Sequence, residues 1–367
     1  MPLRLHLYDD NLSSPTYQQD ILPFVDGLVH TTRLNGGFHD MVFRVGTTLA
    51  EFWEWYLNRR LYRLVLAEDS GKVIWEGRYE DPELGEGGTV IKCYGYWANF
   101  TDRMLQAKTY SAKTAKEIIV DMRDTTGTAE QLSDDDTHID DPGVDLTITY
   151  TDLQLWDALT NQDNGVTAFT STTSEPWFLA VWEDRKIYFK ARDVSAITWQ
   201  VDLQDLTAVP RIRGPFRSMR NSVYSVYDSS RTSTTTDTTS ITKYLTRDYA
   251  VRDIVGNQAT AENRRNKELE FRKDIHAEIP EILVGSVRDA NGATRSICRV
   301  RAGDVIRIND LIPATVNPGE VQLDALNTFF IRETKCDHNT NTLRIVPDVP
   351  DLSLHKALAA AQLRIIQ

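Results

Sequence analysis

Apolar and polar residues alternate with a period of two over many short stretches, which is the pattern of half-buried β-strands. The opening stretch, residues 3–7, alternates leucine with Arg4 and His6. An Asn-Gly-Gly sequence at residues 35–37 supplies the positive φ angles of a tight hairpin turn. Further strands are predicted at residues 25–34, 38–45, 61–67, 73–79, 90–96, 177–181, 186–190, 221–227, 282–287, 295–300, 305–308, 329–334 and 342–345. The chain is therefore predicted to be mainly β.

Fewer stretches carry apolar residues three and four positions apart, as an amphipathic helix does. The predicted helices are residues 47–58, 113–123, 148–159, 259–275 and 353–366. Thr47 or Thr48 is expected to cap the first of these, and Thr151 or Asp152 the third. The acidic, glycine-rich residues 81–88 predict a loop, and the Ser/Thr/Asp-rich residues 229–239 predict a mobile loop or a long hairpin tip.

The order of these elements divides the 367 residues into several parts, since domains usually hold about 100–200 residues. Residues 1–103 predict a β unit crossed by one helix, and residues 104–200 a mixed α/β unit. Residues 201–350 predict a second β unit with a loop and helix insertion at about 228–280, and residues 351–367 form a C-terminal helix or tail. The predicted fold class is α+β, mainly β.

The formal net charge is −12, which disfavours general attraction to a nucleic-acid backbone. Like charge would instead let DNA pass a surface without adhering. Three cysteines, Cys93, Cys298 and Cys336, lie far apart in the sequence, and they predict ordinary thiols in a reducing compartment rather than a disulfide framework or a zinc site. The seven histidines also show no metal-ligand spacing. Neither a secretory signal nor a membrane span is expected.

Sequence motifs for catalysis are missing. The chain has no Gly-x-Ser-x-Gly turn, no phosphate-binding Gly-x-x-x-x-Gly-Lys-Ser/Thr loop and no His-Glu-x-x-His zinc motif. We therefore predict no catalytic, cofactor-binding or metal-binding residues.

Two acidic clusters could be exceptions, one as a calcium site and one as a catalytic carboxylate pair. Residues 134–141 hold five aspartates that could bind calcium, but the glycine and glutamate of the EF-hand pattern are not in place, so a solvated loop is favoured. Glu80, Asp81, Glu83 and Glu86 could supply the carboxylate pair of a glycoside hydrolase. Their crowding in a glycine-rich stretch favours a surface turn.

One aromatic cluster could serve either as a sugar-binding platform or as packing. Its members are Phe52, Trp53, Trp55, Tyr56, Tyr94, Tyr96 and Trp97. Their helical and alternating spacing favours a core or a subunit interface, where aromatic side chains dominate the buried contacts.

Four stretches, taken in order, resemble a known family. They are residues 3–9 with the turn at 35–37, residues 177–189, residues 220–227 followed by a polar loop, a charged helix and Pro280, and residues 300–308 followed by 330–334 and 343–347. In this order the chain resembles the tail-hub proteins of siphophages, which are similar to the baseplate hub of contractile tails. The resemblance spans nearly the whole chain and includes no catalytic motif.

This resemblance implies a fold and an assembly. Residues 1–103 and 201–350 would each form a β-barrel domain similar to the tail-tube fold, with the mixed domain between them. Three subunits would form a homotrimeric ring with a pseudo-sixfold surface for the hexameric tube. The implied protein is a structural, non-enzymatic minor tail protein, folded in the host cytoplasm and located in the virion of a bacteriophage, at the tail tip or baseplate.

The resemblance also implies partners. The hub would join the tail tube or distal tail protein to a central fibre or spike, and contact the tape-measure protein. It would line or close the channel through which DNA passes during ejection without specific binding. The sequence leaves open a tail-associated cell-wall hydrolase, a carbohydrate- or receptor-binding module, or another ring component of the tail.

Overall fold

A computed structural model describes most of the chain in two compact units. The described residues are 3–9, 16–59, 62–68, 70–125, 132–143, 145–161, 165–170, 177–192, 196–208, 210–211, 219–227, 230–254, 258–273, 279–311 and 327–348. The first unit is drawn from residues 1–209, 281–321 and 327–347, and the second mainly from residues 210–280. No helix among the described residues is long and apolar enough to cross a membrane. The predicted helix at 353–366 lies outside the described residues.

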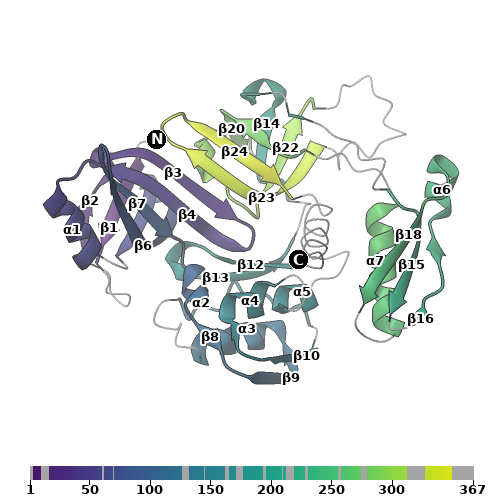
Figure 1. The fold of residues 1–367 in the computed structure, drawn as a ribbon. Helices are drawn as coiled ribbons and strands as arrows, with labels where there is room; N and C mark the ends of the chain where they lie inside the picture. Colours follow the sequence, from purple (N-terminus) through teal and green to yellow (C-terminus); the bar gives the residue numbers. More distant parts are fainter. Residues whose placement is uncertain are drawn as a thin grey trace. The chain divides into compact units, whose positions relative to one another are not determined.

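The first unit is built on one long sheet, whose first half uses N-terminal strands (Figure 1). These are β1 (Leu3–Tyr8), β2 (Tyr17–Asp20), β3 (Val25–Arg33), β4 (Gly36–Val45), β5 (Arg63–Glu68), β6 (Val73–Gly85) and β7 (Gly88–Tyr94). They pair in the order β2-β1-β5-β6-β7-β4-β3, and every pairing is antiparallel. The predicted hairpin at residues 35–37 is confirmed, with positive φ at Gly36 and Gly37.

The second half of the sheet comes from strands late in the chain. Its members are β14 (Trp199–Asp202), β19 (Ile282–Val284), β20 (Val287–Asp289), β21 (Thr294–Arg295), β22 (Val305–Asn309), β23 (Thr328–Asp337) and β24 (Thr342–Pro347). They continue from β3 in the order β23-β22-β14-β20-β21, while β24 lies beside β23 and pairs with β19. The path is open at both ends, so the described strands do not close into a barrel. The mainly β fold is confirmed.

Two predictions in this half need correction. The stretch 282–287 is not one strand, because β19 and β20 are separated at Gly285, which bends away to bond Asp205. Residues 295–300 are mostly the 3-10 turn η4 (Ile297–Arg299) rather than a strand. The hairpin predicted at 329–334 and 342–345 is confirmed as β23 and β24.

The predicted helix at 47–58 is confirmed as α1 (Leu49–Asn58). Thr48 is its N-cap, and Thr48 and Glu51 form a reciprocal capping box that satisfies backbone N–H groups at the helix start. Trp55 is the buried residue of the helix and packs against Tyr79 of β6. The short η1 turn (Leu22–Phe24) precedes β3.

The predicted loop at residues 81–88 is wrong. The strand β6 runs on to Gly85 and pairs with β7 down to the turn, where Gly87 and Gly88 adopt positive φ. Pairing with a neighbouring strand on the sheet outweighs the poor strand propensity of the acidic and glycine residues.

A mixed α/β layer covers residues 98–191. It contains α2 (Ala98–Thr101), α3 (Ala115–Thr125), α4 (Leu155–Thr160), α5 (Val166–Thr170) and the strands β8 (Met104–Leu105), β9 (Lys108–Thr114), β10 (Asp145–Tyr150), β11 (Leu153–Gln154), β12 (Trp177–Val181) and β13 (Ile187–Ala191). These elements enclose one core that includes Ile118, Leu155, Leu179 and Phe189. The helix predicted at 113–123 is confirmed, as is the hairpin at 177–190, whose turn holds η2 (Glu183–Arg185).

The helix predicted at 148–159 begins later than expected. Residues 145–150 are the strand β10, paired with β9, and α4 starts at Leu155 after Gln154. Neither Thr151 nor Asp152 caps it, because Asp152 takes a positive φ and the chain turns there. Leu146, Ile148 and Tyr150 alternate into the core, and this strand pattern outweighs the helical spacing that predicted a helix here.

The second unit is a small sheet with helices. It contains β15 (Ser222–Tyr227), β16 (Ser230–Arg231), β17 (Thr235–Thr236), α6 (Thr238–Tyr244), β18 (Asp248–Ile254) and α7 (Gln258–Arg272). Val223, Val251 and Leu269 form its small core. The predicted charged helix is confirmed as α7. The run 229–239 is not one loop in its described part, because it contributes β16 and β17, and Asp237 caps α6 by accepting from the Ser240 N–H. The 3-10 turn η3 (Leu203–Asp205) belongs to the first unit, where it directly follows β14.

Candidate functional site

The pairing of β3 with β23 joins the N-terminal strands of the sheet to the strands that come late in the chain. Five consecutive cross-strand pairs run from Arg33 opposite Glu333 to Val29 opposite Asp337. At its centre the buried hydroxyls of Thr32 and Thr334 lie 2.6 Å apart, and the Ala302 N–H donates to Thr32 Oγ1 at 2.8 Å. This pairing of β3 with β23, here called the seam, joins segments about 300 residues apart into a single sheet.

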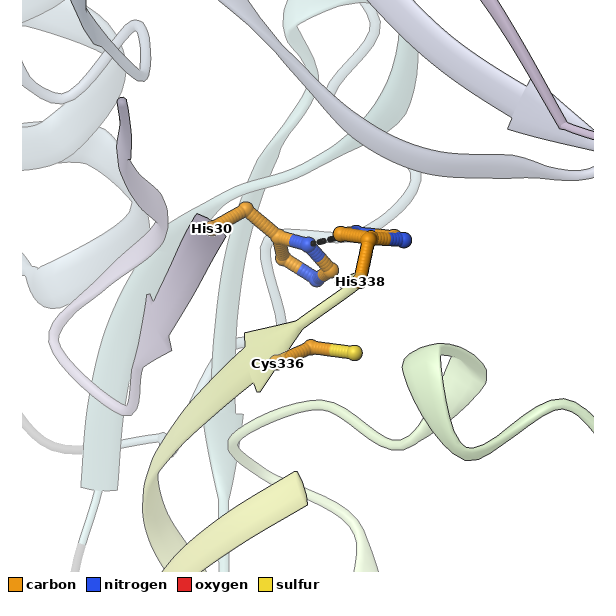
Figure 2. Close-up of side chains that lie close together, drawn as sticks. All are labelled: His30, Cys336 and His338. Atoms are coloured by element: carbon orange, nitrogen blue, oxygen red, sulfur yellow. Dashed lines mark hydrogen bonds between the residues drawn. The ribbon is translucent and has the colours of Figure 1, made fainter. Parts of the chain in front are cut away.

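Four sulfur- and nitrogen-bearing side chains meet at one end of the seam. His30 on β3 pairs directly with Cys336 on β23, and His338 follows two residues later (Figure 2). The His30 Nδ1 and His338 Nε2 atoms lie 2.9 Å apart. Cys298 of η4 is joined to Cys336 by a disulfide, with Cα atoms 5.7 Å apart, and its Sγ lies 3.7 Å from His338 Nδ1. We call these four residues the Cys-His cluster.

Three members of the Cys-His cluster are shielded from solvent, and the fourth is half-buried. His30 and Cys336 are fully buried, Cys298 is 5% exposed, and His338 is the half-buried member. Burial lowers the pKa of His30 well below its usual value, and the neighbouring His338 lowers it further. Burial also lowers the pKa of His338, to about 4. Both imidazoles are therefore neutral at neutral pH, with lone pairs available.

The cluster overturns one prediction from sequence spacing. Cys298 and Cys336 are not separate thiols, because 38 residues of chain fold back to bring them together. His30 and His338, for which the sequence showed no metal-ligand spacing, lie side by side although 308 positions separate them. Only Cys93 remains a free thiol among the described residues, and burial raises its pKa well above the usual value. Local spacing carries no signal for residues brought together by a seam between distant strands.

Ion pairs fix η4 and the η2 turn against the sheet. Arg299 donates to both carboxylate oxygens of Glu68 at the end of β5. Arg301 donates to Glu183 at 2.8 Å, and its guanidinium lies over the Trp182 ring. These contacts hold the segment that carries Cys298 in a defined place.

The acidic residues 134–141 turn toward separate basic partners. Asp136 pairs with Arg123, Asp135 with Lys186 at 3.2 Å, and Asp140 with Lys190 at 3.4 Å. The Asp135 side chain also accepts from the Thr137 hydroxyl, which lowers its pKa to about 2. Among the described residues no three carboxylates converge as ligands, and the single convergent group that could hold a metal is in the Cys-His cluster.

The acids at residues 80–86 lie along the β6–β7 hairpin and not around a cleft. Glu80 pairs with Arg78, while Glu83 is 3.5 Å from Lys92, and both Glu83 and Lys92 are largely exposed. Burial raises the pKa of Glu80. Glu80 shares Arg78 with Asp102, and Asp81 accepts a hydrogen bond from the Tyr94 hydroxyl, so these acids are engaged along the hairpin and its neighbours.

The aromatic cluster divides between core and surface. Trp55 and Tyr96 are buried, and Trp97 stacks on His39 with ring centroids 4.6 Å apart. Trp53 and Tyr56 of α1 are 48% and 39% exposed, beside the still more exposed Leu49 and Leu57. The core half of the expectation is confirmed, whereas the exposed face of α1 is available for contact with another molecule.

Comparison with solved structures places this fold among phage tail proteins. The 43 kDa tail protein of prophage MuSo2 from Shewanella oneidensis matches with a TM-score of 0.57 and 12% identity, covering 94% of this chain and 98% of that one. A tail protein from Neisseria meningitidis MC58 matches with a TM-score of 0.57 and 10% identity, covering 94% and 96%. Prophage tail protein gp18 from Listeria monocytogenes EGD-e matches with a TM-score of 0.54 and 12% identity, covering 98% and 99%.

These matches extend over 94–98% of this chain and 96–99% of each neighbour. The resemblance to phage tail proteins inferred from the sequence is therefore confirmed at the level of the fold. No protein-family model and no curated protein sequence matches the chain.

Proposed function

We propose that this chain is a structural, non-enzymatic subunit of a bacteriophage tail, forming a trimeric hub at the tail tip or baseplate. The observation that carries the proposal is the full-length fold match to prophage tail proteins, which covers 94–98% of the chain. At identities of 10–12% these matches show a shared fold, so the role as a hub rests in addition on the layout of the sheet and on the net charge.

The layout of the sheet supports a hub. Strands from the N-terminal part and strands from the C-terminal part form two runs that meet edge to edge at β3 and β23. We propose that these two runs, which are open in the described residues, correspond to two tail-tube-like β domains, covering residues 1–103 and 201–350 with an insertion at about 228–280. The mixed α/β part at residues 104–200 would lie between them. Two such domains in each of three subunits would present six similar surfaces to a sixfold tube.

The acidic net charge supports a ring through which DNA passes without being bound. With a net charge of −12, a ring of three chains would carry about three times that excess of acidic groups, which opposes adhesion of a polyanion. In this proposal the ring joins a distal tail or tube protein to a central fibre or spike, and the tape-measure protein and DNA pass through it. An electrostatic map of the assembled ring with a lumen lined by Lys and Arg would contradict this part.

Native mass spectrometry of the purified chain tests the stoichiometry. We expect a complex of three copies, with trimer increasing with protein concentration. A stable dimer under the same conditions would contradict a closed hub, because neither a ring of three nor its pseudo-sixfold face can be built from it.

The cell-wall hydrolase remains the second candidate from the sequence, and the described residues give it no convergent catalytic constellation. Incubating the purified protein with peptidoglycan and measuring released fragments tests it directly. We expect no turnover above a heat-denatured control. Release that scales with protein concentration would replace the structural role by an enzymatic one.

A further inference from the structure

The Cys-His cluster has the ligand set of a structural metal site. Two cysteines and two histidines from three separate segments of the first unit meet in one buried place: His30 on β3, Cys298 on η4, and Cys336 with His338 at the end of β23. We propose that these four side chains bind one Zn²⁺ ion when both cysteines are thiols. This proposal does not depend on the role in a phage tail.

The distances between the ligand atoms suit a tetrahedral ion. Zinc binds nitrogen at about 2.0–2.1 Å and sulfur at about 2.3 Å, so tetrahedral neighbours stand about 3.3 Å apart for two nitrogens and about 3.6 Å for nitrogen and sulfur. The His30 Nδ1 and His338 Nε2 atoms are 2.9 Å apart, and Cys298 Sγ is 3.7 Å from the other nitrogen of His338, Nδ1. One ligand atom from each of His30, Cys336 and His338 lies within 4.8 Å of the others. Because one ion binds a single nitrogen of each imidazole, His338 would bind through Nδ1 beside Cys298 Sγ and His30 through Nε2, and both rings would turn to centre the ion.

One nitrogen of the cluster also lacks a partner. The Nε2 atom of His30 is buried and has no hydrogen-bond partner among the described residues. An unsatisfied polar atom in a fully buried side chain carries a desolvation cost, which a bond from His30 Nε2 to the ion would offset.

Charge and ligand type select the metal. Two thiolates balance the +2 charge of the ion, so the complex is neutral and can be buried without a further counter-ion. Sulfur and imidazole ligands exclude Ca²⁺ and Mg²⁺, which take oxygen ligands, and favour Zn²⁺. Four protein ligands leave no open position, so the site would be structural rather than catalytic.

Binding and the disulfide exclude one another. When Zn²⁺ binds, each of the two thiols gives up its proton to solvent and each sulfur forms a bond to the metal, with no change of oxidation state. The disulfide between Cys298 and Cys336 uses the same sulfur atoms. Either form fastens η4 to β23, but only the metal would also fasten His30 of β3, and so cross-link the two halves of the sheet.

Metal analysis of the full-length protein tests the proposal. The chain is expressed in medium with added Zn²⁺, purified under a thiol-free phosphine reductant, dialysed, and measured for zinc by mass spectrometry. We expect about one zinc per chain, as a closed four-ligand site retains its ion. In parallel, titration of the reduced, metal-free protein with Co²⁺ alone should produce the visible absorption of a tetrahedral thiolate complex, saturating at about one equivalent.

Matched variants locate the ion. His338→Ala and Cys298→Ser should each lose most of the zinc and the Co²⁺ absorption. Cys93→Ala removes the buried thiol outside the cluster, and His39→Ala removes a histidine that stacks on Trp97; both should keep the metal. Because a cluster variant could fail to fold, the Co²⁺ spectrum of the unsubstituted protein stands as an independent measurement. Less than about a tenth of an equivalent of zinc together with no Co²⁺ spectrum, or zinc retained in both cluster variants, would overturn the proposal.

Discussion

Glu68 at the end of β5 accepts hydrogen bonds from the Nε and Nη2 atoms of Arg299 in η4, although 231 residues separate them in the sequence. The Glu68 side chain is fully buried and Arg299 is 19% exposed. The pair therefore anchors η4, which also carries Cys298, to the N-terminal half of the sheet. Removing the Glu68 charge takes away two charge-assisted hydrogen bonds at a buried position.

Glu68→Gln keeps the shape of the side chain and removes its charge. We expect the free energy of unfolding to fall by about 2 kcal/mol, because a neutral amide cannot replace the two charge-assisted hydrogen bonds that the buried carboxylate accepts from Arg299. Urea denaturation followed by tryptophan fluorescence measures this. Glu83→Gln is the matched control, since Glu83 faces Lys92 on the exposed hairpin, and it should change stability by about 0.5 kcal/mol or less. Equal losses in the two variants would contradict the account.

The same pair predicts a pH dependence with a defined sign. The hydrogen bonds from Arg299 hold the pKa of Glu68 below its usual value, so the folded state favours the ionised carboxylate. Its contribution is complete above the unfolded pKa of about 4.3 and is lost as the pH falls through the lower folded pKa. The difference in unfolding free energy between the unsubstituted protein and Glu68→Gln should therefore shrink as the pH drops below about 4. A difference that stays constant from neutral pH to pH about 3 would show that Glu68 titrates normally.

Gly37 marks a close approach between β4 and β12. It pairs with Val181 across a parallel contact, has a φ of +79°, and a Cβ built there would lie 2.1 Å from the Val181 carbonyl oxygen. Gly37→Ala should lower stability by about 3 kcal/mol, since the neighbour is backbone and cannot yield. Gly27→Ala is the control, because Gly27 also has a positive φ, of +65°, and open space around its Cβ position.

The Gly27→Ala control isolates the conformational cost, about 1 kcal/mol for an L-residue in this region. Thermal unfolding of both variants separates steric overlap from backbone strain. If Gly27→Ala were as damaging as Gly37→Ala, the close approach of β4 to Val181 would not explain the effect.

Two tryptophans on α1 should respond differently to truncation. Trp55 is 4% exposed and packs on Tyr79, whereas Trp53 on the same helix is 48% exposed. Trp55→Ala should cost about 3–5 kcal/mol through the lost packing and the cavity it leaves. Trp53→Ala should stay within about 0.5 kcal/mol in the isolated subunit. Chemical denaturation at low protein concentration measures both, and a large loss for Trp53→Ala would show that α1 buries its other face.

Local patterns predicted most individual elements. The hairpin turn at residues 35–37, the capped helix α1 and the pair β23–β24 each depend on neighbours within a few residues, so periodicity and turn chemistry sufficed. The errors also have local causes. Residues 81–85 have poor strand propensity but gain a partner in β7, and residues 148–150 alternate into a core that the helical spacing concealed.

Long-range contacts could not be predicted in this way. Nothing near His30 indicates that Cys336 lies opposite it, because the pairing of β3 with β23 depends on how the whole sheet is assembled. For the same reason the sequence carries no sign that Cys298 and His338 are neighbours in the fold. The basic partners of the acidic loop also come from other segments: Asp136 pairs with Arg123 of α3, Asp135 with Lys186 and Asp140 with Lys190 of β13.

The symmetry of the assembled protein tests the central claim most directly. Class-averaged electron micrographs of the purified complex, viewed along its axis, should show a closed ring with three subunits and six similar lobes at its rim. Such a ring is what two β units per subunit and a threefold axis require. A ring with true sixfold symmetry and six chains would contradict the hub and identify a distal or tube component of the tail instead.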